Sequence, residues 1–210
     1  MVRVVLALAS CVLLSCRFRQ TEAPQEEFSL GEAMKKQRGF SLIELLIVVA
    51  IILIIAAIAI PNLLRSKIAA NESSAVGSVR TIGTAEVTYS SSWGSGYAID
   101  LQSLGGPSPC VAATAAAACL IDPLLSAPAP ATKSGYTFNA AGTLLVGTVF
   151  NGFEVAAWPN TVQTTGVRGF CDDQTGVLKF ISPSPAVMPV GAGSCAGVAT
   201  APGVSGPVGN

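Results

Sequence analysis

A single carboxylate, Glu44, lies inside an otherwise uncharged apolar run from Phe40 to Ile60. A carboxylate in a membrane span costs on the order of a few kcal/mol, so we expect this acid to have a function and a cationic partner. An α-amine on Phe40 would lie on the same helical face, four residues earlier, if the chain were cut after Gly39. The alternative is an acid at the membrane edge that reaches the headgroups or stays protonated.

The apolar run has the length of a membrane span. A helix of about 20 apolar residues crosses a hydrocarbon core of roughly 30 Å, which makes this run too long for the core of a secretory signal. The residues just before Gly39 are basic: Lys35, Lys36 and Arg38. Basic residues before a span favour a cytoplasmic N-terminus, although Arg65 and Lys67 follow the span. We expect one spanning helix, which stays in the mature chain.

These residues carry a resemblance. The stretch RGFSLIELLIVVAIILIIAAIAIP resembles the N-terminus of type IV pilins and of the pseudopilins of type II secretion systems. In that family a prepilin peptidase cuts after the glycine and the new N-terminal phenylalanine is N-methylated, which corresponds to Gly39 and Phe40. The family's glutamate matches Glu44, and its helix-kinking proline matches Pro61. The resemblance implies that Glu44 neutralises the N-terminal amine of a neighbouring subunit during filament assembly.

The resemblance also implies partners and a location. The partners are the prepilin peptidase and methyltransferase, further copies of the chain and other pilins in a helical filament, an inner-membrane assembly platform, and membrane lipid before assembly. The precursor is expected to be a single-pass inner-membrane protein with a cytoplasmic N-terminus. After assembly it is expected in an extracellular pilus or a periplasmic pseudopilus.

The leader, residues 1–39, is longer than is usual in that family. A start at Met34 would give a leader of ordinary length, so we expect that the start codon has been assigned too far upstream and that residues 1–33 are not part of the leader. The alternative is a lipoprotein signal, because LALAS before Cys11 and a poorer version before Cys16 resemble its cleavage box.

After Pro61 the sequence predicts an amphipathic continuation of the helix to residue 92. Proline removes a backbone donor and clashes with the preceding turn, so Pro61 should bend or loosen the helix. Apolar residues recur at intervals of three, four or seven: Leu64, Ile68, Ala75, Val79, Ile82 and Tyr89. Charged residues are expected on the other faces: Arg65, Glu72, Arg80 and Glu86. The stretch Ser90–Gly96 should end the helix.

The rest of the chain predicts an α+β, pilin-like fold. Residues 93–134 are expected to form a long loop, and residues 135–182 an antiparallel sheet of about four strands that packs one face on the helix. The strand-like segments are Gly135–Ala140, Thr143–Phe150, Phe153–Pro159, Gly169–Asp173 and Val177–Ser182. The pairs AG and NG and the segment DQTG mark turns between them. The Gly- and Pro-rich tail, residues 183–210, has too few core residues to fold alone.

Four cysteines follow the expected cut: Cys110, Cys119, Cys171 and Cys195. Four cysteines allow three pairings. We favour Cys110 with Cys119 and Cys171 with Cys195, because each pair closes a short loop and the second ties the tail to the sheet. The spacing matches no zinc signature.

The sequence offers little catalytic chemistry. It has no histidine, and histidine is the commonest general base and the commonest metal ligand in proteins. Asp172 and Asp173 are interpreted as an acidic turn, since a calcium loop needs more oxygen ligands. There is no phosphate-binding or nucleophile motif and no basic stripe. We therefore expect no enzymatic activity, no cofactor, no metal and no nucleic-acid partner.

Our leading hypothesis is a structural subunit, major or minor, of a type IV pilus. The first alternative is a pseudopilin of a type II secretion system. The second is a membrane-tethered binding module whose loop Tyr97–Ser134 contacts a ligand.

Overall fold

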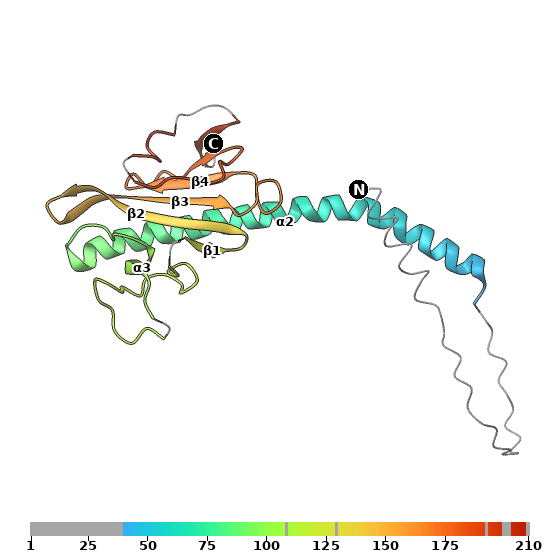
Figure 1. Cartoon of the computed structure of the whole chain (residues 1–210), viewed down its shortest axis with the longest axis horizontal. Coiled ribbons are helices and arrows are strands. Elements are labelled where there is room, and N and C mark those ends of the chain that lie inside the picture. The colour runs from blue at the N-terminus through green and yellow to red at the C-terminus, as the bar shows by residue number, and fades with distance from the viewer. Residues whose placement is uncertain (1–39, 108, 129, 192, 199–202, 209–210) are drawn as a thin grey trace, which may run out of the picture. The chain divides into compact units, whose positions relative to one another are not determined.

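The computed structural model describes residues 40–210, apart from residues 108, 129, 192, 199–202 and 209–210. Helices and strands are labelled in Figure 1. The chain divides into a unit that ends at Leu45 and a second unit, Leu46–Asn210, which contains the sheet. The basic leader residues and Gly39 lie outside the described residues.

A single long helix, α2, runs from Leu42 to Trp93, over 52 residues that include Pro61. It ends where Gly94 adopts a φ of +62° and donates its N–H to the carbonyl oxygen of Ser90 at 3.1 Å. A residue in the left-handed region commonly ends a helix in this way, and glycine adopts that conformation without a steric cost. The helix therefore ends within residues 90–96, as the sequence predicts.

Within the described residues, six antiparallel strands form one sheet, and they are arranged in chain order. Their bounds are β1 Ala131–Lys133, β2 Tyr136–Val146, β3 Val149–Pro159, β4 Gly169–Asp173, β5 Lys179–Ile181 and β6 Ser205–Pro207. A short helix, α3 (Leu101–Leu104), lies in the connection between α2 and β1. The predicted α+β class is confirmed, with six strands where about four were expected.

The two predicted turns at 141–142 and 151–152 are wrong, because both pairs lie inside the long strands β2 and β3. The hairpin turns instead at Gly147, whose φ is +64°. A Cβ on Gly142 would lie 2.6 Å from the ring of Phe150, and one on Gly152 would lie 2.6 Å from the hydroxyl oxygen of Thr143. The two strand glycines therefore give room to neighbouring side chains rather than reversing the chain.

The two strands at the sheet edges, β1 and β6, lie in segments where the sequence predicts none. Strand β1 falls in the expected loop, and β6 falls in the Gly- and Pro-rich tail. Each pairs with its neighbour over three residues. Backbone groups at a sheet edge need partners, and a passing segment of almost any composition can supply them. Side-chain pattern alone therefore does not reveal such strands.

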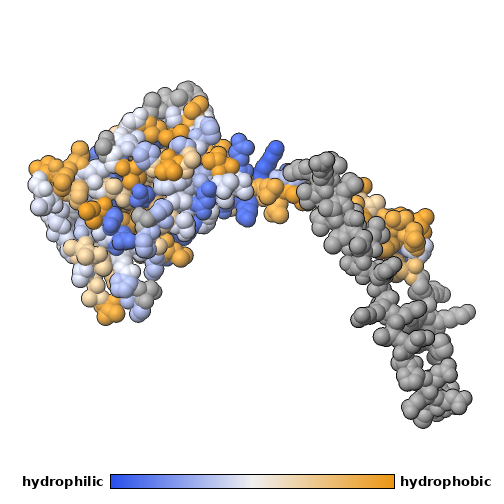
Figure 2. All heavy atoms as spheres, in the orientation of Figure 1, coloured by the Kyte–Doolittle hydropathy of each residue, from blue (hydrophilic) through white to orange (hydrophobic). Residues whose placement is uncertain are grey.

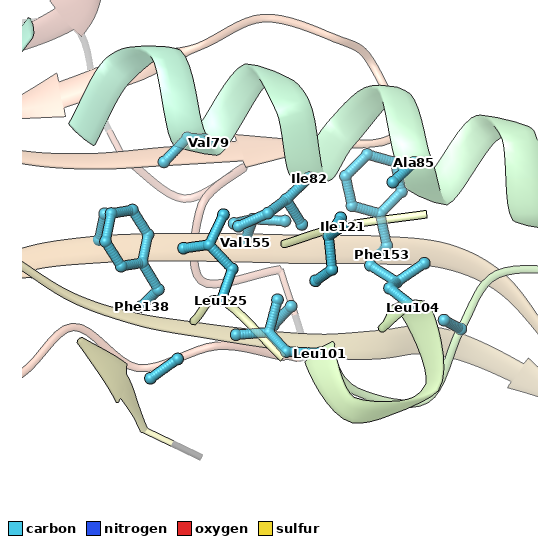
Figure 3. Packing of buried hydrophobic residues seen from close by; sticks show 14 of the residues in the cluster. Val79, Ile82, Ala85, Leu101, Leu104, Ile121, Leu125, Phe138, Phe153 and Val155 are labelled. Carbon is cyan, nitrogen blue, oxygen red and sulfur yellow. The ribbon is translucent and has the colours of Figure 1, made fainter. Parts of the chain in front are cut away.

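The main core lies between α2 and one face of the sheet. Figure 3 shows Val79 and Ile82 of α2 above Phe138 and Val155 of the strands, with Phe153 beside Ala85 of the same helix. Residues from the connection after α2 complete this cluster: Leu101, Leu104, Ile121 and Leu125. All but Ala85, Ile121 and Phe153 are at most 1% exposed. This face of the sheet packs on the helix, as the sequence predicts.

A second, smaller core covers the opposite face of the sheet. Successive residues of a strand point to opposite faces, so Val155 and Ala157 belong to the main core while Ala156 and Trp158 belong to the second. The tail contributes Met188 to the second core. The tail therefore forms part of the folded head, a term we use for α2 from Ala70 onward together with the sheet and the segments that cover it.

Candidate functional site: the N-terminal segment and its junction with the head

The first turn of α2 is held by Glu44. Its Oε2 accepts a hydrogen bond from the amide of Ser41 at 3.0 Å, and the amide of Leu45 donates to the Ser41 carbonyl oxygen at 3.3 Å. A glutamate three residues after a helix-capping serine forms half of a capping box in this way. A carboxylate there is also favoured by the helix dipole. Our sequence analysis did not predict this contact, although the spacing Ser-x-x-Glu is the pattern that could have indicated it.

The apolar half of α2 is exposed. Phe40 is 81% exposed, and large apolar side chains from Leu42 to Leu64 remain open along the helix. The helix contains an 18-residue window apolar enough to cross a membrane, and none of that window is buried. Figure 2 shows this part of the helix in the colours of apolar residues. An apolar surface of this length needs lipid or other helices to cover it.

The sequence-predicted residues of the N-terminal site lie as follows. Phe40 precedes α2 and is exposed, Glu44 lies in the first turn, and Pro61 lies within the helix. Lys35, Lys36, Arg38 and Gly39 lie outside the described residues. The described residues of this site are therefore positioned by the helix and the residues just before it, and not by the sheet.

A second polar centre joins α2 to the connection between β3 and β4. Glu72 is 6% exposed, so its predicted place on another helix face is wrong. Its Oε1 accepts from the amides of Val167 and Arg168 at 2.9 and 3.1 Å, and its Oε2 accepts from Nε and Nη2 of Arg168 at 2.8 and 2.7 Å. Four donors satisfy the buried carboxylate, which is why burial is tolerated.

Neighbouring contacts fix the same connection. The side-chain amide of Asn71 donates to the carbonyl oxygen of Thr165 at 2.8 Å, and the Tyr136 hydroxyl donates to that of Arg168 at 2.8 Å. Burial, with Glu72 nearby, raises the pKa of the Tyr136 hydroxyl above its ordinary value. The connection is therefore held by the helix on one side and by β2 on the other.

A third polar centre lies where the chain leaves α2. Glu86 is fully buried, so its predicted place on an outer face is also wrong. Its Oε2 accepts from the amide of Ala98 at 2.9 Å, while Oε1 has no hydrogen-bond partner within the described residues. Burial raises the pKa of Glu86 to about 8, although the Ala98 amide acts in the opposite direction. At neutral pH the Glu86 carboxyl is therefore mostly protonated and uncharged, and in this form it holds the segment that follows the helix.

A pocket of about 420 Å³ lies between α2 and the turn after β4. Its walls include Arg80, Gly83 and Asp172. Burial raises the pKa of the Asp172 carboxyl above its ordinary value. The adjacent Asp173, the last residue of β4, accepts from the amide of Thr175 at 2.9 Å and so holds the turn that follows, whereas Asp172, also predicted in the turn, lies within the strand. Within the described residues, no three metal-binding side chains come together.

Two disulfides hold the long connection after α2 and the Gly- and Pro-rich tail, the two segments in which the sequence predicts few core residues. Cys110 is joined to Cys119 and Cys171 to Cys195, with Cα atoms 6.2 and 5.8 Å apart. Buried Glu154 accepts from the amide of Cys195 at 3.1 Å and from that of Gly191 at 2.6 Å. The ammonium group of Lys179 donates to the carbonyl oxygen of Cys195 at 3.1 Å. The tail is therefore bonded to β3, β4 and β5.

Comparison with known proteins concerns the N-terminal segment. Residues 34–60 match the family model described as the prokaryotic N-terminal methylation motif. The chain is 46% identical over 54 residues to the type IV major pilin protein PilA of Myxococcus xanthus, which is 26% of this chain and 24% of that one. It is 59% identical over 39 residues to the type IV wide pilus major component PilA4 of Thermus thermophilus, which is 19% of this chain and 30% of that one.

The chain thus spans less than a third of the length of these curated relatives. No solved structure matches it. The matched residues include the expected cut, Phe40, Glu44 and the exposed apolar half of α2. The N-terminal segment of the chain therefore carries the prokaryotic N-terminal methylation motif and is similar to that of type IV major pilins.

Proposed function

We propose that the chain is a structural subunit of a type IV pilus, held in the inner membrane by α2 and then assembled into a surface filament. The observation that carries the proposal is the exposed apolar half of α2, which begins at Leu42, contains Glu44 in its first turn, and belongs to the same continuous helix as the buried residues of the head. A helix of this kind can exchange lipid for neighbouring helices. The proposed role is structural and not enzymatic.

The exchange of lipid for protein changes hydrophobic free energy little, because lipid tails are as apolar as leucine side chains. Close packing and polar contacts must then determine how the helices align. We assign the polar contact to Glu44, paired with the N-terminal amine that cleavage after Gly39 creates on Phe40 of a neighbouring copy. The cap on Ser41 uses Oε2, which leaves Oε1 available for that amine.

Processing follows from the same segment in this proposal. The prepilin peptidase removes residues 1–39, with Lys35, Lys36 and Arg38 as the basic part of the leader, and the new terminus at Phe40 is N-methylated. Residues 40–60 then form the membrane-spanning and filament-core part of the helix. An inner-membrane assembly platform and other pilins are the further partners.

One observation favours a pilus over a secretion pseudopilus, namely that both relatives described above are named as pilus components. The head is also reinforced by two disulfides and a tail that covers the second face of the sheet, which suits a subunit outside the cytoplasm, in the periplasm or at the cell surface.

The first experiment is mass analysis of the N-terminal peptide, separately on sheared surface material and on membranes. N-methylated Phe40 in the sheared fraction is the expected result. A chain that begins at a lipidated Cys11 or Cys16 and stays in the membranes would overturn the proposal. Gly39→Val should leave an unprocessed precursor, and a mature chain starting at Phe40 from that variant would contradict the cleavage site.

The role of Glu44 is tested by two substitutions. Glu44→Gln keeps an oxygen that can accept from the Ser41 amide but removes the charge, whereas Glu44→Ala removes both. We expect both variants to insert into the membrane and to lose most filament yield, measured in the sheared fraction against membrane content. Normal yield from Glu44→Gln would overturn the role that we give to the charge, and a loss from Glu44→Ala alone would assign the effect to the cap on Ser41.

A further inference from the structure

We propose that a pocket at the junction between the exposed half of α2 and the head binds the phosphate of an anionic phospholipid headgroup. The pocket has a volume of about 360 Å³. Its walls include Arg65, Ile68, Ala69 and Glu72 of α2, and Val167 and Arg168 of the connection between β3 and β4. The inference rests on the proposed function in one respect, namely that α2 spans a membrane before assembly.

Arg168 presents a guanidinium held in place from several sides. Glu72 accepts from its Nε and Nη2, and its guanidinium carbon lies 5.6 Å from the ring centre of Phe170 and 5.8 Å from that of Phe180. The Arg168 side chain is still 44% exposed. A guanidinium carries five N–H donors, so three remain for a ligand. A planar donor group fixed in this way suits the oxygens of a phosphate.

The charge of the pocket is positive. Arg65 is exposed, and no ion pair joins it to any described residue. The walls thus carry two guanidinium groups against one carboxylate, and both oxygens of that carboxylate, on Glu72, already accept hydrogen bonds from the connection. Apart from Ser182, the rest of the wall is formed by the apolar residues Ile68, Ala69 and Val167. A single anionic group attached to an apolar body matches this combination.

The position along the helix selects a lipid over other phosphates. The exposed apolar run ends at Leu64, and Arg65 is the next residue. The helical wall residues are spaced at i, i+3, i+4 and i+7, which places them on one face. They cover about 10 Å along the axis, and a headgroup layer is roughly 5–8 Å thick on each side of the hydrocarbon. Helical side chains also lean toward the N-terminus, which directs Arg65 back to the membrane surface.

The test uses the purified full chain in detergent, with native mass spectrometry to count bound lipid molecules. The probes are phosphatidylglycerol, which is anionic, and phosphatidylcholine, which is zwitterionic. We expect tighter binding of phosphatidylglycerol, and a loss of about fivefold in that affinity for Arg65→Gln. Equal binding of the two lipids would overturn the site.

The matched control is Lys67→Gln. Lys67 is exposed, carries the same charge and lies two residues from Arg65, but it is not part of the pocket wall. Binding of phosphatidylglycerol by this variant should change less than twofold. Equal losses from the two variants would show a diffuse surface charge and overturn the pocket. Both side chains are exposed, so the unfolding midpoint should stay the same, which verifies that the head is intact.

Two further measurements, competition with inorganic phosphate and comparison with filament formation, distinguish the remaining explanations. Excess inorganic phosphate should leave most phosphatidylglycerol bound, whereas full displacement would make the pocket a site for free phosphate and overturn the lipid assignment. The binding measurement requires no filaments. Missing filaments with selective lipid binding would overturn the proposed function alone, and normal filaments without selective binding would overturn this inference alone.

Discussion

Arg168 and Glu72 lie 96 residues apart in the chain, and two nitrogens of the Arg168 guanidinium donate to one oxygen of Glu72, at 2.8 and 2.7 Å. The other carboxylate oxygen accepts two backbone amides of the same connection. This contact joins the start of the head helix to the segment between β3 and β4. It thereby orders the wall of the proposed lipid pocket.

Glu72→Gln should lower the free energy of unfolding by about 2 kcal/mol. Breaking a fully buried ion pair costs roughly 3–5 kcal/mol, and solvent reduces that value here because the Arg168 side chain is 44% exposed. Denaturant unfolding of the full chain in detergent measures the change. The control is Asp122→Asn, which removes an exposed pair with Lys133 at 3.6 Å and should cost at most about 0.5 kcal/mol. Equal costs would contradict the structural role of Glu72.

Stability should fall as pH rises through the window defined by Glu86. Its pKa is about 8 in the folded chain, against an ordinary value of 4.5. Between these values the folded chain binds more protons than the unfolded chain, so the stabilisation is complete below the lower value and is lost toward the upper one. The slope contributed by one group is at most about 1.4 kcal/mol per pH unit.

Glu86→Gln separates this effect from other titrations. The amide keeps an oxygen for the Ala98 N–H and does not ionise, so the variant should show a flatter dependence of unfolding free energy on pH. Burial raises the pKa of Asp172 in the same direction, and part of the slope should therefore remain. Parallel curves for the parent chain and the variant would rule out the contribution of Glu86.

The buried glutamates explain what sequence periodicity did and did not reveal. The apolar stripe of the head helix was predicted from Ala75, Val79, Ile82 and Tyr89, and all four are buried. The predicted stripe has seven-residue gaps, and Glu72 and Glu86 fill them. A search for apolar periodicity treats every glutamate as polar and therefore predicts that it is exposed. Its burial depends on donors from Ala98, Val167 and Arg168, which no local pattern contains.

The N-terminal segment was more predictable because its determinants are close in sequence. Phe40 and Glu44 are only four residues apart, and the match to the methylation motif covers residues 34–60. The hairpin turn and the edge strands depend instead on packing between distant segments. Gly142 was interpreted as a turn residue, whereas it makes room for the ring of Phe150. The sequence alone does not distinguish a glycine that forms a turn from one that makes room for a neighbouring side chain.

Two helix glycines should respond differently to alanine. A Cβ on Gly77 would meet nothing within 4 Å, whereas one on Gly83 would lie 2.9 Å from Oδ2 of Asp172. Gly77→Ala should therefore raise the free energy of unfolding by up to about 1 kcal/mol. Gly83→Ala should gain nothing, because the 5% exposed Asp172 must move. Adding Asp172→Ala should restore the gain relative to Asp172→Ala alone. Equal gains from the two single alanine variants would contradict this packing.

The two disulfides should differ in what they stabilise. Cys171 and Cys195 are 24 residues apart, and Cys110 and Cys119 are 9 apart. The loop-length term favours the longer loop by only about 1 kcal/mol. The larger difference should come from the second core, because Met188 and Cys195 of the tail lie against Ala156 and Trp158.

We therefore expect paired serine substitutions at Cys171 and Cys195 to cost more stability than those at Cys110 and Cys119. Loss of the bond between Cys171 and Cys195 should also make residues 183–198 accessible to elastase. This protease cleaves after small residues, and the segment has no lysine or arginine at which trypsin could cleave. The pair at Cys110 and Cys119 is the matched control and should leave that segment protected. Protection of the tail in both variants would show that Glu154 and Lys179 hold it without the disulfide.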